Sequence, residues 1–467
     1  MRQTRHRFAP GVRRMATNPF ARPWIALFVF PLAMDYKAAT TSDSHWAQIA
    51  LVVPVLIAGA ALMLIGPRVR DRSALRAWVT GSLILAVPAS LLTEWLQENS
   101  IGQYVRVLLP FLLFQLGFAV ACRPWQAARL EQFEKTLFWA NVVSLAFTCL
   151  YGLIVAGSLE QVRYRIVSVT FLALQGVLLH EFVVAKRYTA LTLVLFMATV
   201  VIELLSVTRS LLVGTALLFA LAVWMSAAGT RTLAHAGVRA LLVAGVLAGM
   251  ALTAAAWFPG VAEHWIQRID FAQSSTKTGE DPTTITRLAE MRDQYDQVLS
   301  SPVSLLVGKG YGHDYGYSPA YLPDLAGQMS KKDFYAERDW AAGHNFWVYQ
   351  FFAGGLLFGL ALPLVLLYAL ARCTITYRRW RAYAPHTPQL PVLGRAILLT
   401  AALPAASIGG NPLGPRFSGL IFGVGLGLMV AMHAQLRHLA QRKARSPMYA
   451  GPRRAPASAE NADALAP

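Results

Sequence analysis

The sequence predicts an all-α integral membrane protein, with about 12 transmembrane helices and one large polar loop that contains short helices. Three observations predict this fold. The 467 residues are 55% hydrophobic and only 14% charged, whereas about a quarter of the residues are charged in soluble domains. Apolar runs of roughly 20 residues, the length that crosses a hydrocarbon core about 30 Å thick, follow one another along the chain. One long polar insertion, at residues 259–344, interrupts them.

The apolar runs divide the chain into four parts. We expect spans near residues 24–40, 46–66, 75–94, 103–121, 136–157, 166–185, 188–206, 209–228, 239–258, 345–372, 391–410 and 416–436. The predicted parts are an N-terminal bundle (1–258), a large loop (259–344), a C-terminal group of helices (345–440) and a disordered tail (441–467). The tail is rich in Ala, Pro and Arg, a composition that buries too little apolar surface to fold.

Basic residues in the short loops orient the chain. Lysine and arginine are frequent in both terminal segments and in the loops at 66–76, 122–135, 185–188, 228–239 and 376–383. Alternate loops, such as 40–45 and 93–100, are poor in them. Because Lys and Arg favour cytoplasmic loops, both termini are predicted to be cytoplasmic and the insertion periplasmic. The net charge of +18 then belongs mainly to loops, and we expect no nucleic-acid partner.

The insertion contains a predicted amphipathic helix at residues 286–300. Apolar residues recur there at helical spacing and predict its packing face: Leu288, Met291, Tyr295 and Leu299. Thr284 or Thr286 is the predicted N-cap. Pro302 and the run GKGYG (308–312) then predict a loop. No strand precedes this glycine run and no Lys-Ser/Thr follows it, so we interpret it as a turn that lets the backbone approach a substrate or the bundle.

Arginines on the predicted periplasmic side run against the orientation signal, which indicates a function for them. The candidate substrate-binding residues are Arg163, Arg165, Arg209, Arg268, Arg287 and Arg292, and Arg416 lies before the last span. A guanidinium group matches phosphate oxygens with two parallel hydrogen bonds, so the set predicts an anion site. Arg287 is the best candidate because the first turn of a helix also favours an anion. Each arginine has an alternative role, at lipid headgroups or in an ion pair, and Arg292 could equally pair with a carboxylate within the loop.

His344 is the candidate catalytic residue. It lies in AAGHNFW, where the insertion returns to the membrane, and imidazole is the usual general base near pH 7. The alternative is a histidine that caps or packs at the start of the helix. His264 and His313 lie in the same insertion and compete with it.

The sequence predicts neither a metal nor another cofactor. The predicted periplasmic loops contain no Asp-x-Asp pair, and the spacing of Asp293 and Asp296 is more typical of a solvated helix face. Cys122, Cys149 and Cys373 form no spaced motif of the kind that binds zinc or builds a disulfide framework.

Three segments, in this order along the chain, match the pattern of one known family. SVTRS (206–210) is similar to a Thr-x-Ser-Arg-Gly pattern, of which only Arg209 carries over. TRLAEMRDQYDQVLSSPVSLLVGKGYG (286–312) resembles a segment with an Arg, a short helix, a Pro and Gly-x-Gly, with Arg287 at the family arginine and Met291 replacing the usual aromatic. HNFWVYQFFAGGLLFG (344–359) resembles a His-Asn helix opening, with His344 at the family histidine. Together these segments resemble the O-antigen ligase and polymerase superfamily of bacterial membrane enzymes.

The resemblance implies a glycosyltransferase of the bacterial inner membrane. An undecaprenyl-pyrophosphate-linked glycan would be the donor, and in the ligase branch the lipid A–core oligosaccharide would be the acceptor, without metal or nucleotide. The arginines would hold the pyrophosphate, His344 would take the proton of the acceptor hydroxyl, and direct attack would invert the anomeric carbon. O-antigen polymerase and O-linked protein oligosaccharyltransferase remain alternatives within the family. A flippase for the same lipid is the alternative of another class, and it should carry polar groups through both leaflets.

Overall fold

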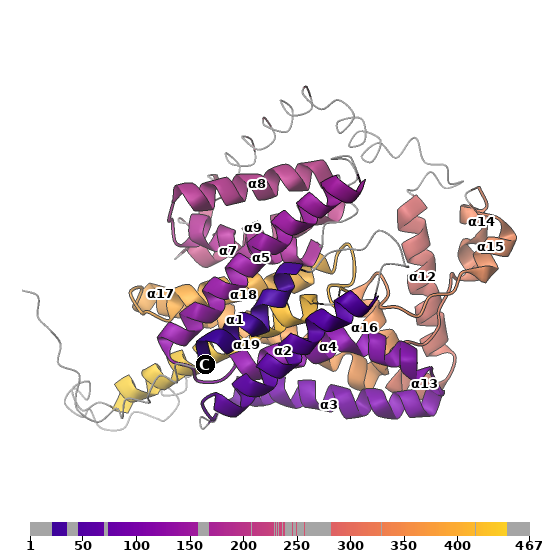
Figure 1. Cartoon of the computed structure of the whole chain (residues 1–467), viewed down its shortest axis with the longest axis horizontal. Helices are drawn as coiled ribbons and strands as arrows, with labels where there is room; N and C mark the ends of the chain where they lie inside the picture. The colour runs from indigo at the N-terminus through magenta and orange to yellow at the C-terminus, as the bar shows by residue number, and fades with distance from the viewer. Residues whose placement is uncertain are drawn as a thin grey trace, which may run out of the picture.

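The computed structural model describes residues 21–34, 45–69, 73–156, 168–206, 208–227, 282–327, 329–415 and 417–445, with isolated positions between 229 and 256. Within these residues the protein is all-helical, as predicted (Figure 1). The isolated antiparallel bridge between Tyr315 and Asp339 is the only β pairing in this part of the chain.

The helices fall into an N-terminal and a C-terminal series. The N-terminal series is α1 (Ala21–Val29), η1 (Phe30–Met34), α2 (His45–Ile65), α3 (Ala74–Gln97), α4 (Ile101–Ala121), α5 (Ala127–Ala156), α7 (Ser168–Leu179), η2 (His180–Val184), α8 (Ala190–Ser206) and α9 (Arg209–Ser226). The C-terminal series is α12 (Pro282–Leu299), α13 (Pro302–Val307), η4 (Pro319–Tyr321), α14 (Leu322–Leu325), α15 (Lys331–Ala336), α16 (Phe346–Gly354), η5 (Gly355–Gly359), α17 (Ala361–Tyr383), α18 (Leu390–Ala406) and α19 (Ser418–Arg445).

Several of these helices are suited to a membrane. Among the described residues, four helices (α3, α4, α9 and α19) are long and apolar enough to cross a bilayer, or five if the bent pair α16–η5 and α17 counts as one span. Shorter apolar helices lie among them, at Ala21–Met34, Ala50–Ile65, Thr170–Val184, Ala190–Leu204 and Leu390–Ala406. Every predicted span overlaps a helix except the one at 239–258, which lies almost entirely outside the described residues. The number of twelve spans therefore stays a prediction.

The predicted span at 345–372 is bent rather than straight. α16 and η5 end at Gly359, and α17 continues at an angle of 84° to them. Gly355 has a φ of +59°, and a Cβ atom there would lie 2.6 Å from the carbonyl of Leu306 on α13. Position 355, just before the bend, requires glycine because glycine accepts the left-handed backbone and lets α13 approach closely.

α12 also departs from the prediction. It begins at Pro282, a residue favoured in the first helical turn because its φ is already fixed. Thr284 and Thr286 therefore lie within the helix and are not its N-cap. The buried face is also different from the predicted one. Tyr295 and Leu299 are 43% and 48% exposed, whereas the buried residues are Ile285, Ala289, Glu290, Gln294 and Val298.

α19 is the central helix, since 94% of its most apolar stretch is buried. Its glycines allow α4 to pack against it at backbone distance. A Cβ atom on Gly419 would overlap the carbonyl of Pro110, and one on Gly423 would overlap the carbonyl of Phe114. Small residues at such contacts are the usual means by which helices approach closely within a membrane.

Arginines tie together the helix ends that lie away from the large insertion. Arg123 donates to the Gly66 carbonyl at the end of α2 (3.1 Å). Arg381 on α17 donates to Val184 at the end of η2 (3.1 Å) and to Met225 at the end of α9 (3.2 Å). Cations at these positions complement the carbonyl groups and the dipole of a helix C-terminus. The basic loops of the sequence therefore have a structural role at these ends.

We expect opposite effects from alanine at two glycines. Gly423→Ala should lower the free energy of unfolding by about 1–3 kcal/mol because the new methyl group forces α4 and α19 apart. Gly81→Ala is the matched control, since nothing lies within 4 Å of a Cβ atom at this exposed position of α3. It should raise stability by roughly 0.5–1 kcal/mol, as alanine does within a helix. Thermal unfolding in detergent measures both, and equal midpoints would show that α4 and α19 do not touch at Gly423.

Candidate functional site

The glycine run at 308–312 anchors the large insertion to the bundle. Asn99, in the turn between α3 and α4, donates from Nδ2 to the carbonyl of Lys309 (2.8 Å), and Thr93 donates to that of Val307 (3.0 Å). On the other side, the Lys309 N–H donates to the carbonyl of Phe352 in α16 (2.7 Å). Gly308, Gly310 and Gly312 have φ values of +80°, +93° and +80°. The run thus lets the backbone approach the bundle, one of the two roles that the sequence allowed.

Several segments form one surface, which we call the loop face. They are the glycine run, the α3–α4 turn, residues 282–345, the starts of α9 and α16, and residues 407–415. Figure 1 shows α12, α14 and α15 together at the right-hand end of the molecule, near α13 and α16.

His344 and Glu290 form the closest polar pair on the loop face. Nδ1 of His344 lies 2.5 Å from Oε2 of Glu290, and the His344 backbone N–H donates to Oε1 (2.8 Å). The His344 side chain is 56% exposed, whereas that of Glu290 is 6% exposed. The carboxylate is therefore buried beneath the imidazole and holds both its ring and its backbone.

The segment before α16 is fixed on both sides of His344. Gly343 allows the approach to α12, since a Cβ atom there would lie 2.7 Å from Oε1 of Glu290. Asn345 caps α16, and its Oδ1 accepts from the N–H groups of Trp347 (2.9 Å) and Val348 (3.1 Å). The side chain of Tyr315 donates to the carbonyl of Ala341 (3.0 Å). These contacts define the position of the imidazole before any substrate arrives.

The pair is suited to proton transfer. A carboxylate only accepts hydrogen bonds, so its contact with Nδ1 places the ring proton on that nitrogen. Nε2 is then the acceptor, and it has no partner among the residues that the structure describes. This arrangement, an acid group that orients a histidine whose other nitrogen is free, is the general form of a histidine base.

Glu290 was not among the sequence candidates. The predicted packing face ran through Leu288 and Tyr295, which placed Glu290 on the side of the helix away from the core. In the structure, Ile285 and Ala289 pack in a small cluster within the insertion and Val298 packs in the main core, and the buried Glu290 and Gln294 lie between them on the helix surface. No local pattern could have identified this face, because Ala289 and Val298 lie on opposite sides of the helix.

The two arginines of α12 have different surroundings. Arg292 lies 3.0 Å from Asp296, and both side chains are exposed, so the alternative of an ion pair within the insertion holds for Arg292. Arg287 is half-buried and has no ion-pair partner in the described ranges. It lies three residues before Glu290, on a neighbouring position of the helix surface. Because α12 begins at Pro282, Arg287 is in the second turn, and the predicted help from the helix N-terminus is wrong.

Arg209 lies near the same region, because residues 407–415 contact both the start of α9 and the start of α16. It is the first residue of α9, and a Cβ atom on Gly409 would overlap the side chain of the adjacent Ser210. The same segment contacts the start of α16, where Nε1 of Trp347 donates to Oγ of Ser407 (2.8 Å). The start of α9 and the His344 segment therefore share a neighbour. The candidates outside the described residues are Arg163, Arg165, Arg268, Arg416 and His264.

His313 has a packing role. Its Nδ1 lies 2.6 Å from Oδ1 of Asn99, and its ring centroid lies 5.9 Å from that of Phe352. Burial lowers the pKa of His313, and the charge of Lys309 lowers it further. The partly buried imidazole joins the glycine run to the α3–α4 turn.

Asp293 and Asp296 of α12 bind groups within the insertion. Oδ2 of Asp293 accepts from the backbone N–H of Gly316 (2.8 Å) and from Gln297 (2.8 Å). In the part of the chain that the structure describes, no group of three or more His, Cys, Asp or Glu side chains could hold a metal ion.

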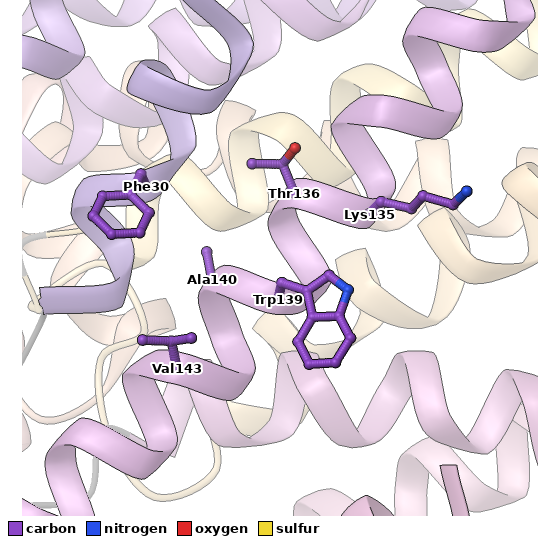
Figure 2. Close-up of a pocket in the computed structure, with 6 residues that line it drawn as sticks. All are labelled: Phe30, Lys135, Thr136, Trp139, Ala140 and Val143. Carbon is purple, nitrogen blue, oxygen red and sulfur yellow. The ribbon is translucent and has the colours of Figure 1, made fainter. Parts of the chain in front are cut away.

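A groove elsewhere in the molecule offers no comparable chemistry. It has a volume of about 290 Å³, and Figure 2 shows its lining, which is mainly apolar: Phe30, Thr136, Trp139, Ala140 and Val143. Lys135 also lines it, but its ammonium group lies 2.8 Å from Glu131. The loop face is therefore the better candidate site. Comparison with models of known families and with curated proteins finds no match to this sequence.

The positive φ values of the glycine run predict a large effect of alanine. Gly312→Ala should lower the free energy of unfolding by more than about 1 kcal/mol, because the residue is left-handed and its methyl group would lie 2.7 Å from the backbone N of Tyr104. Gly102→Ala, where the nearest atom would be 3.9 Å away, is the control. Limited proteolysis should show cleavage within residues 282–345 for the Gly312 variant only. Equal resistance of the two variants would show that the run does not anchor the insertion.

Proposed function

We propose that this protein is a glycosyltransferase that moves an undecaprenyl-pyrophosphate-linked glycan onto a hydroxyl acceptor, without metal or other cofactor. More specifically, we propose an O-antigen ligase whose acceptor is the lipid A–core oligosaccharide. The observation that carries the proposal is the exposed imidazole of His344 held by the buried carboxylate of Glu290. The resemblance of the segments around Arg209, Arg287 and His344 to the ligase and polymerase superfamily supplies the substrates.

His344 would act as the general base. Its Nε2 would take the proton from the acceptor hydroxyl as the oxygen attacks the anomeric carbon of the donor. The bond between that carbon and the phosphate oxygen breaks, and undecaprenyl pyrophosphate leaves with the electron pair. Glu290 would be a positioning residue, which holds the ring and stabilises the positive charge that the ring gains.

The arginines would act on the leaving group. Negative charge grows on the pyrophosphate as the bond breaks, and donors fixed in advance stabilise it. Arg287 supports this role because it is half-buried, lies one helical turn from Glu290 and has no ion-pair partner in the described structure. Residues 407–415 contact both the start of α9, where Arg209 lies, and the start of α16, which follows His344. Arg163, Arg165 and Arg268 stay candidates from the sequence, whereas Arg292 pairs with Asp296.

The proposed location is the bacterial inner membrane, with twelve spans, both termini in the cytoplasm and the loop face in the periplasm. The orientation rests on the distribution of Lys and Arg in the short loops. It is supported by the helix ends at Gly66, Val184 and Met225, where arginines from the predicted cytoplasmic loops bind the terminal carbonyls.

The same site would serve an O-antigen polymerase or an O-linked protein oligosaccharyltransferase, which differ in the acceptor. Loss of ligated glycan, of long polymer or of glycosylated protein on deletion of the gene distinguishes the three. A lipid-linked glycan flippase is disfavoured, because the pair of His344 and Glu290 provides a base that transport does not require.

We expect transfer to depend on both members of the pair. His344→Gln keeps a hydrogen-bonding side chain but cannot carry a proton away, so the rate should fall by about 10²- to 10⁴-fold. Glu290→Gln should lower it by roughly 10- to 100-fold, the usual loss when the partner that orients a functional histidine is removed. The measurement is transfer by purified protein from a defined donor to lipid A–core.

The double variant provides the sharper result. If Glu290 acts through His344, the double variant should be no slower than His344→Gln alone, because residues that act as a unit are not additive. Glu337→Gln, at an exposed position, is the control and should transfer normally. Transfer by His344→Gln at close to the wild-type rate would remove the proposed base.

A conservative change at Arg287 should be costly. Arg287→Lys keeps the charge but loses the planar fork, and one charge-assisted hydrogen bond is worth about 1.5–3 kcal/mol, or one to two decades in rate. Arg287→Ala should be slower still, with a raised KM for the donor. Near-normal transfer by Arg287→Ala, at normal protein levels in the membrane, would exclude Arg287 from the site.

A further inference from the structure

One arginine beside the loop face was not a candidate from the sequence. Arg106 is on α4, five residues after its first residue, Ile101, and therefore about 8 Å along the helix axis. Its side chain is exposed, and its Cζ lies 5.7 Å from the centre of the Trp340 ring. It has no carboxylate partner among the residues placed by the structure. A cation–π contact does not use the N–H donors of a guanidinium group.

Trp340 connects this arginine to the candidate base. It lies four residues before His344, so the two Cα atoms are no more than about 14 Å apart. Its backbone N–H donates to Oδ1 of Asp339 (2.7 Å), and Asp339 pairs with Tyr315 in the β bridge. Trp340 thus contacts Arg106 from the same segment that contains His344.

The position of Arg106 is unusual for a basic residue. The proposed topology puts it near the periplasmic surface, where Lys and Arg are disfavoured in short segments. A cation–π contact such as that with Trp340 is worth only about 0.5–1 kcal/mol at an exposed site. A guanidinium group without a carboxylate partner is well suited to a phosphate group.

The surrounding helices indicate which substrate it meets. α4 makes its main contacts with α19, α2 and α3, whereas α12 packs on α16 and α9 packs on α18 and α7. Arg106 therefore comes from a different part of the bundle than Arg287 and Arg209, the proposed donor residues. In an inverting displacement the acceptor and the leaving group lie on opposite faces of the reacting sugar.

We propose that Arg106, positioned by Trp340, binds a phosphate group of the acceptor glycolipid and so presents its hydroxyl to His344. This inference rests on the proposed function. A bilayer headgroup carries the same chemistry, so the experiment must distinguish the two sources of phosphate.

The test compares acceptor kinetics in phosphate-free maltoside micelles, with lipid A–core and with the same acceptor after removal of its phosphate groups. Arg106→Ala should raise the KM for the phosphorylated acceptor by roughly 10- to 100-fold. The kcat and the KM for the donor should change little. The dephosphorylated acceptor should show the raised KM with the wild type already, and Arg106→Ala should add nothing to it.

Controls separate binding from structure and from failure of the proposed function. Arg338→Ala removes an exposed arginine two residues before Trp340 and should leave the KM unchanged. Trp340→Ala should raise the acceptor KM as Arg106→Ala does, and Trp340→Phe, which keeps a ring, should raise it less. Wild-type transfer that is lost in His344→Gln establishes the reaction first. The inference is overturned if Arg106→Ala raises the donor KM instead, leaves the acceptor KM unchanged in micelles, or weakens both acceptors equally.

Discussion

The organisation of the loop face depends on one buried carboxylate. Glu290 is 4% exposed, and a carboxylate cannot remain so far from water without hydrogen-bond donors. His344 supplies two of them, its backbone N–H and its ring Nδ1. Satisfying Glu290 therefore fixes the segment before α16 against α12, and it does so in an orientation that leaves Nε2 without a partner among the described residues. The proposed chemistry depends on this same contact.

The rest of the insertion fixes the position of the contact between His344 and Glu290 relative to the helix bundle. The glycine run binds both the α3–α4 turn and α16, so the insertion is attached to the helices on either side of it. The bend after Gly359 gives α16 a direction different from that of α17, and the contact between Gly355 and Leu306 accompanies this bend. As a result, a polar segment, rather than the middle of a long apolar helix, presents the imidazole at the loop face.

The sequence predicts the features that depend on composition and local pattern. The helical class follows from the apolar runs, and the place of His344 follows from its position directly before a capped helix. The features it missed depend on contacts between distant residues. Leu288 and Tyr295 form a regular apolar stripe, but tertiary packing buries Ile285 and Val298 instead, and with them Glu290. The bend between α16 and α17 likewise accompanies the approach of Leu306 to Gly355, which no local pattern contains.

In the proposed reaction, an activated acceptor hydroxyl displaces the lipid pyrophosphate in a single step. The most direct measurement is the anomeric configuration of the product made by purified protein from a donor of known configuration, in excess chelator. A single displacement predicts a product of inverted configuration. A product of retained configuration would contradict it, because retention requires two displacements and a nucleophile that forms a glycosyl–enzyme intermediate, and His344 would then not be the base for a direct attack.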